Sequence, residues 1–252
     1  MTMHNKTAPA ARVIALGLLL IAAVSVARAE FSQWTSHADI TVNTTNSGIT
    51  GDISNFPILI RLTSADFDFS ALSFDDGRDL RFAKHDGTPL DYEIERCDAA
   101  AGYAEIWVLM DMVAANDATQ SIVMYCGNPD ATDASNPAAV FSTANAFEGV
   151  WHLDEDASGT GNGGVYLDRT GNNNHGDDHV SVTDKEGIIG KGQGFAGNDR
   201  YAIQVPDDAT LDFNLNSDDM TLSGWLKLAD TPPSNWDTYL YKHDGDGSYP
   251  GY

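Results

Sequence analysis

The 252-residue sequence has few basic residues and only two cysteines. Its 14 Lys and Arg residues are outnumbered by 37 Asp and Glu residues, which gives a formal net charge of -23. This charge argues against nucleic acid or an anionic membrane as a partner, because both would repel it. It fits a solvated acidic surface, a protein of a salty medium, or a protein that binds cations.

Motifs of several large functional classes are also missing. The sequence has no Gly-x-Ser-x-Gly, no phosphate-binding loop and no EF-hand. The run Gly190–Gly194 has alternating glycines, but it precedes an expected strand rather than opening a helix, so we interpret it as a turn. These absences favour a non-catalytic protein.

The long apolar run of the chain lies at its N-terminus and is typical of a secretory signal peptide. Lys6 and Arg12 supply positive charge, Val13–Val26 is apolar, and Ala27-Arg28-Ala29 matches an A-x-A cleavage site. The run is short for a membrane span, and an uncleaved anchor is the alternative. Removing residues 1–29 takes away three basic residues and no acid, so the net charge changes from -23 to -26. We expect an exported protein of the periplasm, cell surface or medium, with no membrane span in the mature part.

Residues 30–142 are predicted to form a domain of short β-strands. Apolar and polar residues alternate in several stretches, and turn-forming residues such as Asp86-Gly87 separate them. The expected strands are Phe56–Leu62, Asp79–Lys84, Leu90–Arg96, Ala104–Val113 and Ser121–Cys126. Helical patterns are weak and confined to Ser64–Leu72 and Pro137–Ala146. The fold class is therefore all-β, with an antiparallel sandwich or a barrel at the N-terminal side.

Few residues of this first domain are candidates for chemistry. Glu93 and Glu95 lie on one face of an expected strand, roughly 6.5–7 Å apart, which can suit a pair of catalytic carboxylates. Alternating acids on the solvated face of an antiparallel strand are ordinary, and we favour that interpretation. Trp107 points away from Ile106 and Val108, so it either packs on the second face or is exposed, where it could stack on a sugar.

Cys97 and Cys126 lie at the ends of two expected strands. In an oxidising compartment an even number of cysteines permits a disulfide. Two unpaired thiols on separate strands are the alternative, because the sequence does not give the Cα separation that a disulfide needs.

Five blocks of the first domain occur in a characteristic order. They are Phe56–Ile60, Gly77–Phe82, Tyr92–Glu95, Ala104–Val108 and Met124–Pro129. This set resembles an uncharacterised bacterial extracytoplasmic β-domain, a domain of unknown function that usually precedes a laminin-G-like domain. The resembled family has no assigned catalytic residues. It often has Tyr at the position of Cys126 and an aromatic residue near Cys97, so the comparison favours a disulfide that is particular to this chain.

Residues 143–252 are predicted to form a second domain with longer loops rich in Gly, Asn and Asp. The small and polar stretch Pro137–Glu148 marks the boundary. The loop Asp168–Gly176 can be ordered without a core, because Asn and Asp tolerate left-handed φ angles and bond their own backbone. The expected strands are Val150–Asp154, Tyr201–Val205, Met220–Leu228 (the clearest) and Trp236–Lys242.

Four blocks of the second domain, Trp151–Glu155, Asp168–Gly176, Gly194–Tyr201 and Thr221–Lys227, follow one another in order. They resemble the laminin-G-like branch of the concanavalin A-like lectin/glucanase superfamily. The resemblance implies a jelly-roll sandwich of two antiparallel sheets. Residues 143–252 are fewer than that sandwich requires, so we expect a C-terminally truncated domain that belongs to a longer protein.

Calcium is the cofactor that the acidic residues favour, since it prefers oxygen ligands from carboxylates and carbonyls. In the resembled superfamily a structural calcium often lies between the first and last strands, which points to Asp154. Asp168, in the Asn-rich loop, completes the predicted metal site. Further carboxylates are Glu155, Asp156, Asp244 and Asp246. An acidic exposed loop without metal is the alternative.

Three functions follow from these features. The first is an exported, non-catalytic recognition module that binds a polysaccharide or surface glycan by stacking and fixed hydrogen bonds. Its predicted ligand-binding residues are Trp236, Asp244, Asp246 and Tyr249. The second, from the resemblance, is the extracytoplasmic head of a MotA/TolQ/ExbB-type biopolymer-transport proton-channel protein, with an envelope protein as its partner. The third is a glycoside hydrolase, but the Glu-x-Asp-x-x-Glu strand of the superfamily's glucanases is absent, so we expect no enzyme.

Overall fold

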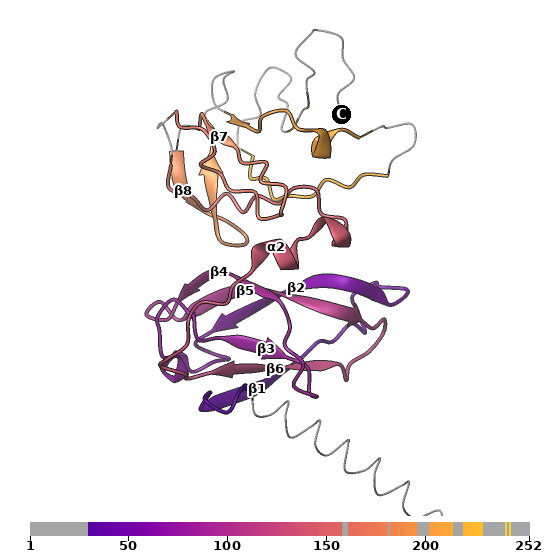
Figure 1. Ribbon diagram of the computed structural model, residues 1–252, viewed down its shortest axis with the longest axis vertical. Helices are drawn as coiled ribbons and strands as arrows, with labels where there is room; N and C mark the ends of the chain where they lie inside the picture. Colours follow the sequence, from indigo (N-terminus) through magenta and orange to yellow (C-terminus); the bar gives the residue numbers. More distant parts are fainter. Residues whose placement is uncertain are drawn as a thin grey trace, which may run out of the picture. The chain divides into compact units, whose positions relative to one another are not determined.

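The computed structural model describes residues 30–157, 161–180, 182–195, 202–213, 219–228, 240 and 242. The chain divides into two compact units between Asn136 and Pro137 (Figure 1), at the start of the stretch that the sequence indicates as the boundary. The predicted signal peptide, residues 1–29, lies outside the described residues. Across these described ranges, no helix has the length and apolar character needed to cross a bilayer.

Unit 1 is an antiparallel β-sandwich of two three-stranded sheets. The strands are β1 (Ser36–Thr41), β2 (Ile53–Thr63), β3 (Arg81–Ala83), β4 (Tyr92–Asp98), β5 (Tyr103–Val113) and β6 (Ser121–Cys126). One sheet has the order β1-β6-β3 and the other has the order β2-β5-β4. A short 3-10 helix, η1 (Phe69–Ala71), lies within the stretch with a weak helical pattern. The predicted all-β sandwich is confirmed.

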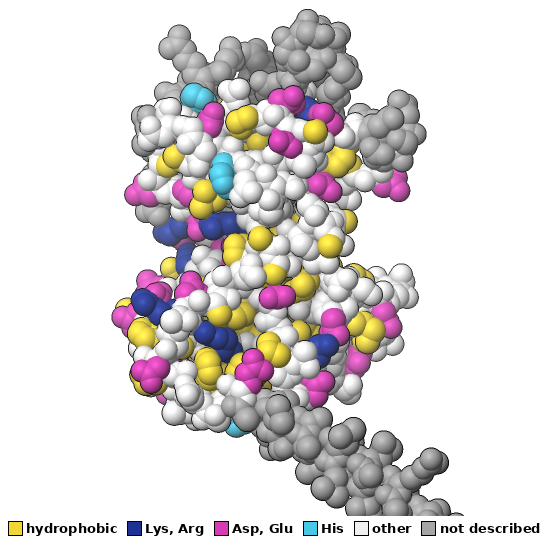
Figure 2. Space-filling view, viewed as in Figure 1, with side chains coloured by type: hydrophobic (Ala, Val, Ile, Leu, Met, Phe, Trp, Pro, Cys, Tyr) yellow, Lys and Arg dark blue, Asp and Glu magenta, His cyan; other side chains and the backbone are white. Residues whose placement is uncertain are grey.

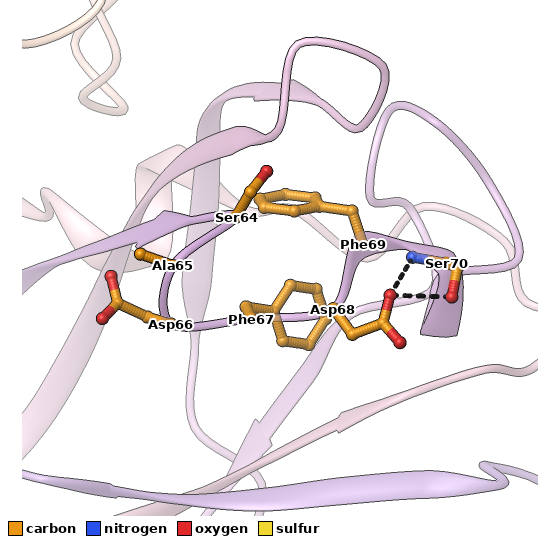
Figure 3. Close-up of a pocket in the computed structure, with 7 residues that line it drawn as sticks. All are labelled: Ser64, Ala65, Asp66, Phe67, Asp68, Phe69 and Ser70. Carbon is orange, nitrogen blue, oxygen red and sulfur yellow. Dashed lines mark hydrogen bonds between the residues drawn. The ribbon is translucent and has the colours of Figure 1, made fainter.

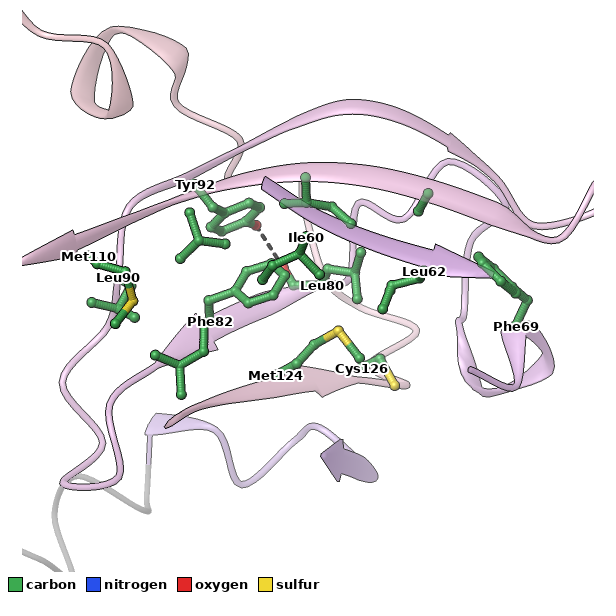
Figure 4. Packing of buried hydrophobic residues seen from close by; sticks show 14 of the residues in the cluster. Ile60, Leu62, Phe69, Leu80, Phe82, Leu90, Tyr92, Met110, Met124 and Cys126 are labelled. Carbon is green, nitrogen blue, oxygen red and sulfur yellow. Dashed lines mark hydrogen bonds between the residues drawn. The ribbon is translucent and has the colours of Figure 1, made fainter. Parts of the chain in front are cut away.

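The core of unit 1 lies between the two sheets (Figure 4). Ile106 and Val108 of β5 face it from one sheet, and Ile122 and Met124 of β6 face it from the other. Successive side chains of a strand point to opposite faces, so the alternation in the sequence places these residues inward. Phe82 of β3 is also fully enclosed.

Two large apolar residues of the predicted strands lie outside the core. Phe56 of β2 and Met112 of β5 are 43% and 45% exposed. At this end of β5 the alternation breaks, because Met110 and Val113 are buried whereas Asp111 and Met112 are exposed. Strand β1 was missed by the sequence pattern, since only Ala38 and Ile40 are apolar and most of the strand is exposed.

The predicted disulfide is not formed, because Cys97 and Cys126 are both free thiols in the structure. Cys97 belongs to β4 and Cys126 to β6, so the two thiols come from different sheets of the sandwich. The Cys126 side chain lies in the core, and the Cys97 side chain is half-buried against it.

A buried tyrosine and two cysteine side chains make the stability of unit 1 sensitive to high pH. Desolvation raises the pKa of Tyr92 to about 12, of Cys97 to about 12 and of Cys126 to about 11. The folded unit therefore holds these protons more tightly than the unfolded chain does. We expect stability that is complete below about pH 9 and is lost progressively as the pH rises through about 11–12.

The measurement is the melting temperature of unit 1 between about pH 7.5 and about pH 10.5, in the intact chain and in Cys126→Ala. The substitution leaves a cavity and lowers the melting temperature at every pH. It also removes one of the raised pKa values, so its melting temperature should fall less steeply with pH. Equal slopes for the two proteins would contradict the expectation.

Unit 2 has short elements in its described residues. They are α2 (Pro137–Val140), η2 (Thr143–Asn145), β7 (Asp177–Asp178), β8 (Val182–Glu186), β9 (Lys191–Gly194), β10 (Ile203–Gln204) and η3 (Ala209–Leu211). Strand β7 pairs with β10, and β8 pairs with β9, both in antiparallel fashion. Helices α2 and η2 occupy the second stretch with a weak helical pattern.

The predicted strands of the second half are only partly formed. Strand β10 occupies the middle of Tyr201–Val205, and Val150–Asp154 contributes one bridge, from Trp151 to Asp168. Met220–Leu228 is not a strand, contrary to the prediction, because a strand must bond its backbone to a neighbour and the described part of the chain offers it none.

Candidate functional site

Asp168 is the centre of the loop Asp168–Gly176. Its Oδ1 accepts hydrogen bonds from the backbone N–H groups of Val150 and Thr170, both at 3.0 Å. Its Oδ2 accepts from the Thr170 hydroxyl at 2.8 Å and from the Asn174 N–H at 3.0 Å. The residue is only 5% exposed. Four donors on one buried carboxylate give the loop a fixed shape.

His175, Trp151 and Asn174 close the same loop. The backbone N–H of Asp168 donates to His175 Nδ1 at 3.0 Å, so the neutral ring carries its proton on Nε2. Trp151 Nε1 donates to the Asn174 carbonyl at 2.8 Å, and Asn174 Nδ2 donates to Thr210 Oγ1 at 2.8 Å. Side chains from two other segments of unit 2, Trp151 and Thr210, therefore bond the loop.

The tip of the loop presents polar groups to solvent. Gly171 and Asn173 are exposed, and Asn173 has a left-handed φ of 60°, which asparagine tolerates. Asn173 Nδ2 donates to the Gly171 carbonyl at 2.9 Å, and Asn172 Nδ2 donates to the Glu148 carbonyl at 3.0 Å. We name the exposed part, residues 171–173, the polar tip.

Tyr166 and Asp178 form a buried pair in the same unit, and both have 0% exposure. The Tyr166 hydroxyl lies 3.2 Å from Asp178 Oδ1, and the Val180 N–H donates to the same oxygen at 3.1 Å. Desolvation and the Asp178 charge raise the pKa of Tyr166, so the hydroxyl stays a donor. The sequence carried no signal for this pair, since both residues lie in loop-like surroundings without apolar alternation.

The predicted calcium ligands have protein partners in the structure. Asp154 Oδ1 pairs with the guanidinium of Arg169 at 3.0 Å, and both oxygens of Asp168 accept hydrogen bonds. The guanidinium takes the place that a cation would need beside Asp154. No group of three or more His, Cys, Asp and Glu side chains among the described residues is arranged to hold a metal ion. The described residues do not fit calcium, and calcium binding stays a prediction.

The predicted ligand-binding residues Trp236, Asp244, Asp246 and Tyr249 lie outside the described residues. Their role stays a prediction. Figure 2 shows carboxylate side chains on both units and fewer basic ones, in keeping with the net charge of -23.

Glu93 and Glu95 do not form a solvated carboxylate pair. Glu93 is 3% exposed, so the expectation that it lies on the wet face of its strand is wrong. Glu95 Oε2 accepts a hydrogen bond from Trp107 Nε1 at 2.6 Å. Nearby, Glu105 pairs with Arg61 at 3.0 Å and with Arg96 at 3.1 Å across the β2-β5-β4 sheet. These partners give the acids of this face a structural role.

His85, Ser121 and Asp39 have the residue types of a catalytic triad but not its geometry. His85 Nε2 lies 2.8 Å from Ser121 Oγ and 3.9 Å from Asp39 Oδ1. In a triad the serine and the aspartate contact opposite ring nitrogens, so that one orients the ring while the other gives up a proton. Here both face Nε2, and His85 and Asp39 are exposed. The arrangement does not activate the serine.

A shallow hollow is lined by the turn Ser64–Ser70 (Figure 3). Phe67 and Phe69 pack edge to face with ring centroids 5.0 Å apart, and Phe69 belongs to the core. Asp68 Oδ1 accepts from the Ser70 N–H at 3.0 Å and from its hydroxyl at 2.7 Å, which lowers the pKa of Asp68. The two rings therefore contribute to packing, and the Asp68 carboxylate stabilises the turn.

Asp79 is a buried carboxylate that the sequence did not single out, and its exposure is 0%. Its Oδ2 accepts from the N–H groups of Ser73 at 3.0 Å and Gly127 at 2.7 Å, while its carbonyl accepts from Trp34 Nε1 at 2.6 Å. Its Oδ1 has no hydrogen-bond partner in the described structure. Gly127 has φ +85°, and a Cβ there would lie 2.3 Å from Thr35 Oγ1, so glycine is required at that turn.

Comparison with known proteins gives one match. Residues 76–156 match the model of a protein family described as a domain of unknown function (DUF2341). No curated protein and no solved structure matches the chain. The matched residues include β3 to β6 of unit 1 and the helices α2 and η2 of unit 2. Over this part the chain is similar to a family whose function is unassigned.

Proposed function

We propose that this chain is an exported, non-catalytic recognition module that binds a polysaccharide or surface glycan through the loops of its second unit. The observation that supports the proposal best is the polar tip on the Asp168 loop. Its groups are exposed, while the residues behind it are bonded to Asp168, Trp151 and His175.

A loop of this kind suits sugar binding on energetic grounds. A ligand that offers many hydroxyl groups is bound by a few hydrogen-bonding groups in fixed positions. A loop that is ordered before binding does not lose conformational entropy when the ligand arrives. The laminin-G-like blocks and the signal-like N-terminus support a lectin-like, exported protein.

The test is binding of the purified chain to a panel of soluble polysaccharides. In Asn173→Gly the tip loses one exposed amide, and glycine keeps the left-handed φ, so the Asp168 hydrogen bonds remain. We expect binding to weaken by roughly five- to tenfold, the value of one hydrogen bond. Asn43→Gly is the matched control, because Asn43 is an exposed asparagine of unit 1 that bonds its own turn through Thr45. It should bind like the unaltered chain.

Two results would count against the proposal. One is a chain that binds none of the polysaccharides, which would favour the alternative of a head that contacts an envelope protein. The other is equal weakening in Asn173→Gly and Asn43→Gly, which would show that binding does not depend on the polar tip.

A further inference from the structure

Residues 219–228 combine a strand-like sequence with an exposed apolar surface. Leu222, Trp225, Leu226 and Leu228 are 58%, 72%, 65% and 62% exposed. In an extended chain Met220, Leu222, Leu226 and Leu228 share one face, because side chains alternate with a period of two. Within the described structure, no hydrogen bond to the backbone or side chains of this segment is found.

Such a segment is a template for strand pairing. Among the described residues its N–H and C=O groups have no partner and can form a ladder, and its large apolar side chains remain in water at a cost in free energy. An exposed apolar patch of this kind marks a contact surface in a soluble protein.

We propose that residues 219–227 pair in antiparallel fashion with the same segment of a second copy of this chain, about a two-fold axis at Ser223. In this register Asp219 of each copy lies opposite Lys227 of the other, which is an opposite-charge pair formed twice. Met220 lies opposite Leu226, so the apolar residues of both copies stay on one face. Thr221 lies opposite Trp225 on the other face.

The charges select this register over its neighbour. A shift by one residue sets Asp219 against Leu228 and Lys227 against Met220, so both ion pairs are lost. The net charge of -23 makes two copies repel each other at long range. Salt screens that repulsion, and it leaves the apolar contact intact. The association should therefore strengthen as the salt concentration rises.

The experiment is sedimentation of the purified chain from about 1 to about 100 µM at two salt concentrations, with a monomer–dimer equilibrium as the expected result. Lys227→Asp places two carboxylates opposite each other in each pair and should weaken dimerisation by roughly tenfold. Lys185→Asp makes the same change in net charge at another exposed lysine and should dimerise like the unaltered chain. The double variant Asp219→Lys with Lys227→Asp should restore dimerisation.

Three results would overturn the proposal. The first is a chain that stays monomeric over the whole concentration range. The second is equal weakening in Lys227→Asp and Lys185→Asp, which would show that only net charge matters. The third is growth into large aggregates, since a two-fold pairing closes at the dimer.

Discussion

Replacing Asp168 with alanine is expected to lower the free energy of unfolding of the second unit by about 4 kcal/mol. The carboxylate accepts hydrogen bonds from three backbone N–H groups and one hydroxyl. Alanine accepts none, so the N–H groups of Val150, Thr170 and Asn174 lose their partner in a place that water reaches poorly. Each buried donor without a partner costs about 1–3 kcal/mol, and partial relaxation of the loop keeps the total below the sum.

Hydrogen exchange measures this effect directly, because the amides of Val150, Thr170 and Asn174 are bonded to Asp168 alone in this loop. They should exchange much faster in Asp168→Ala, and urea unfolding of unit 2 should shift to lower concentration. Asp156→Ala is the control, since Asp156 is an exposed acid of the same unit. It should change stability by less than about 0.5 kcal/mol. Unchanged exchange in Asp168→Ala would contradict the role of this carboxylate.

The Asp168→Ala variant also tests the calcium prediction. If calcium binds through Asp168 in solution, calcium raises the melting temperature of the unaltered chain but not of Asp168→Ala. If the hydrogen bonds of the structure describe the loop fully, calcium and a chelator leave both melting temperatures unchanged.

Replacing Asp79 with alanine is expected to destabilise unit 1 by about 3–4 kcal/mol. The N–H groups of Ser73 and Gly127 both donate to Oδ2, and charge-assisted hydrogen bonds of this kind contribute about 1.5–3 kcal/mol each. The Gly127 turn cannot move easily toward another acceptor, because its backbone lies against Thr35. Loss of the carboxylate therefore loosens the contact between the turn after β6 and the segment before β3.

The variant Asp79→Asn tests how much of the effect comes from the charge of the side chain, because asparagine has nearly the same shape and no charge. The amide keeps one oxygen that can accept from Ser73 and Gly127, so its loss of stability should be smaller than that of alanine. Asp91→Ala removes an exposed acid from the same unit and serves as the control. Urea unfolding followed by tryptophan fluorescence is a suitable measurement, since the Trp34 indole, one of five in the sequence, donates to the Asp79 carbonyl. Equal midpoints for Asp79→Ala and Asp91→Ala would refute the expectation.

The sequence predicted the positions of the strands of unit 1 better than it predicted which of their side chains are buried. Alternation placed β5 and β6 and most of their inward residues, because the two faces of a strand follow from local geometry. It predicted too long a strand at β3, which begins at Arg81 and not at Asp79. Asp79 is a buried loop residue before the strand. It also placed Glu93 in water, although the side chain is buried. Alternation distinguishes two faces of a strand but does not say what covers each face.

In the second unit the sequence indicated an ordered Asn-rich loop and named Asp168 in it. Only the structure gives this carboxylate its role, because its donors come from residues 150, 170 and 174 and could not be paired by inspection. The same limit explains Met220–Leu228, whose pattern is that of a strand. Side-chain alternation in the sequence predicts which residues share a face of a strand. The backbone hydrogen bonds of the strand depend on a second strand from another part of the chain.

The sequence by itself determined the acidic character of the chain and the all-β class, since these follow from composition and from side-chain alternation over short distances. Tertiary structure decided which carboxylates hold the fold together, as at Asp79 and Asp168. It also decided that Cys97 and Cys126 lie in different sheets as free thiols. The physical reason is that burial, hydrogen bonding and thiol separation depend on contacts between residues far apart in the chain.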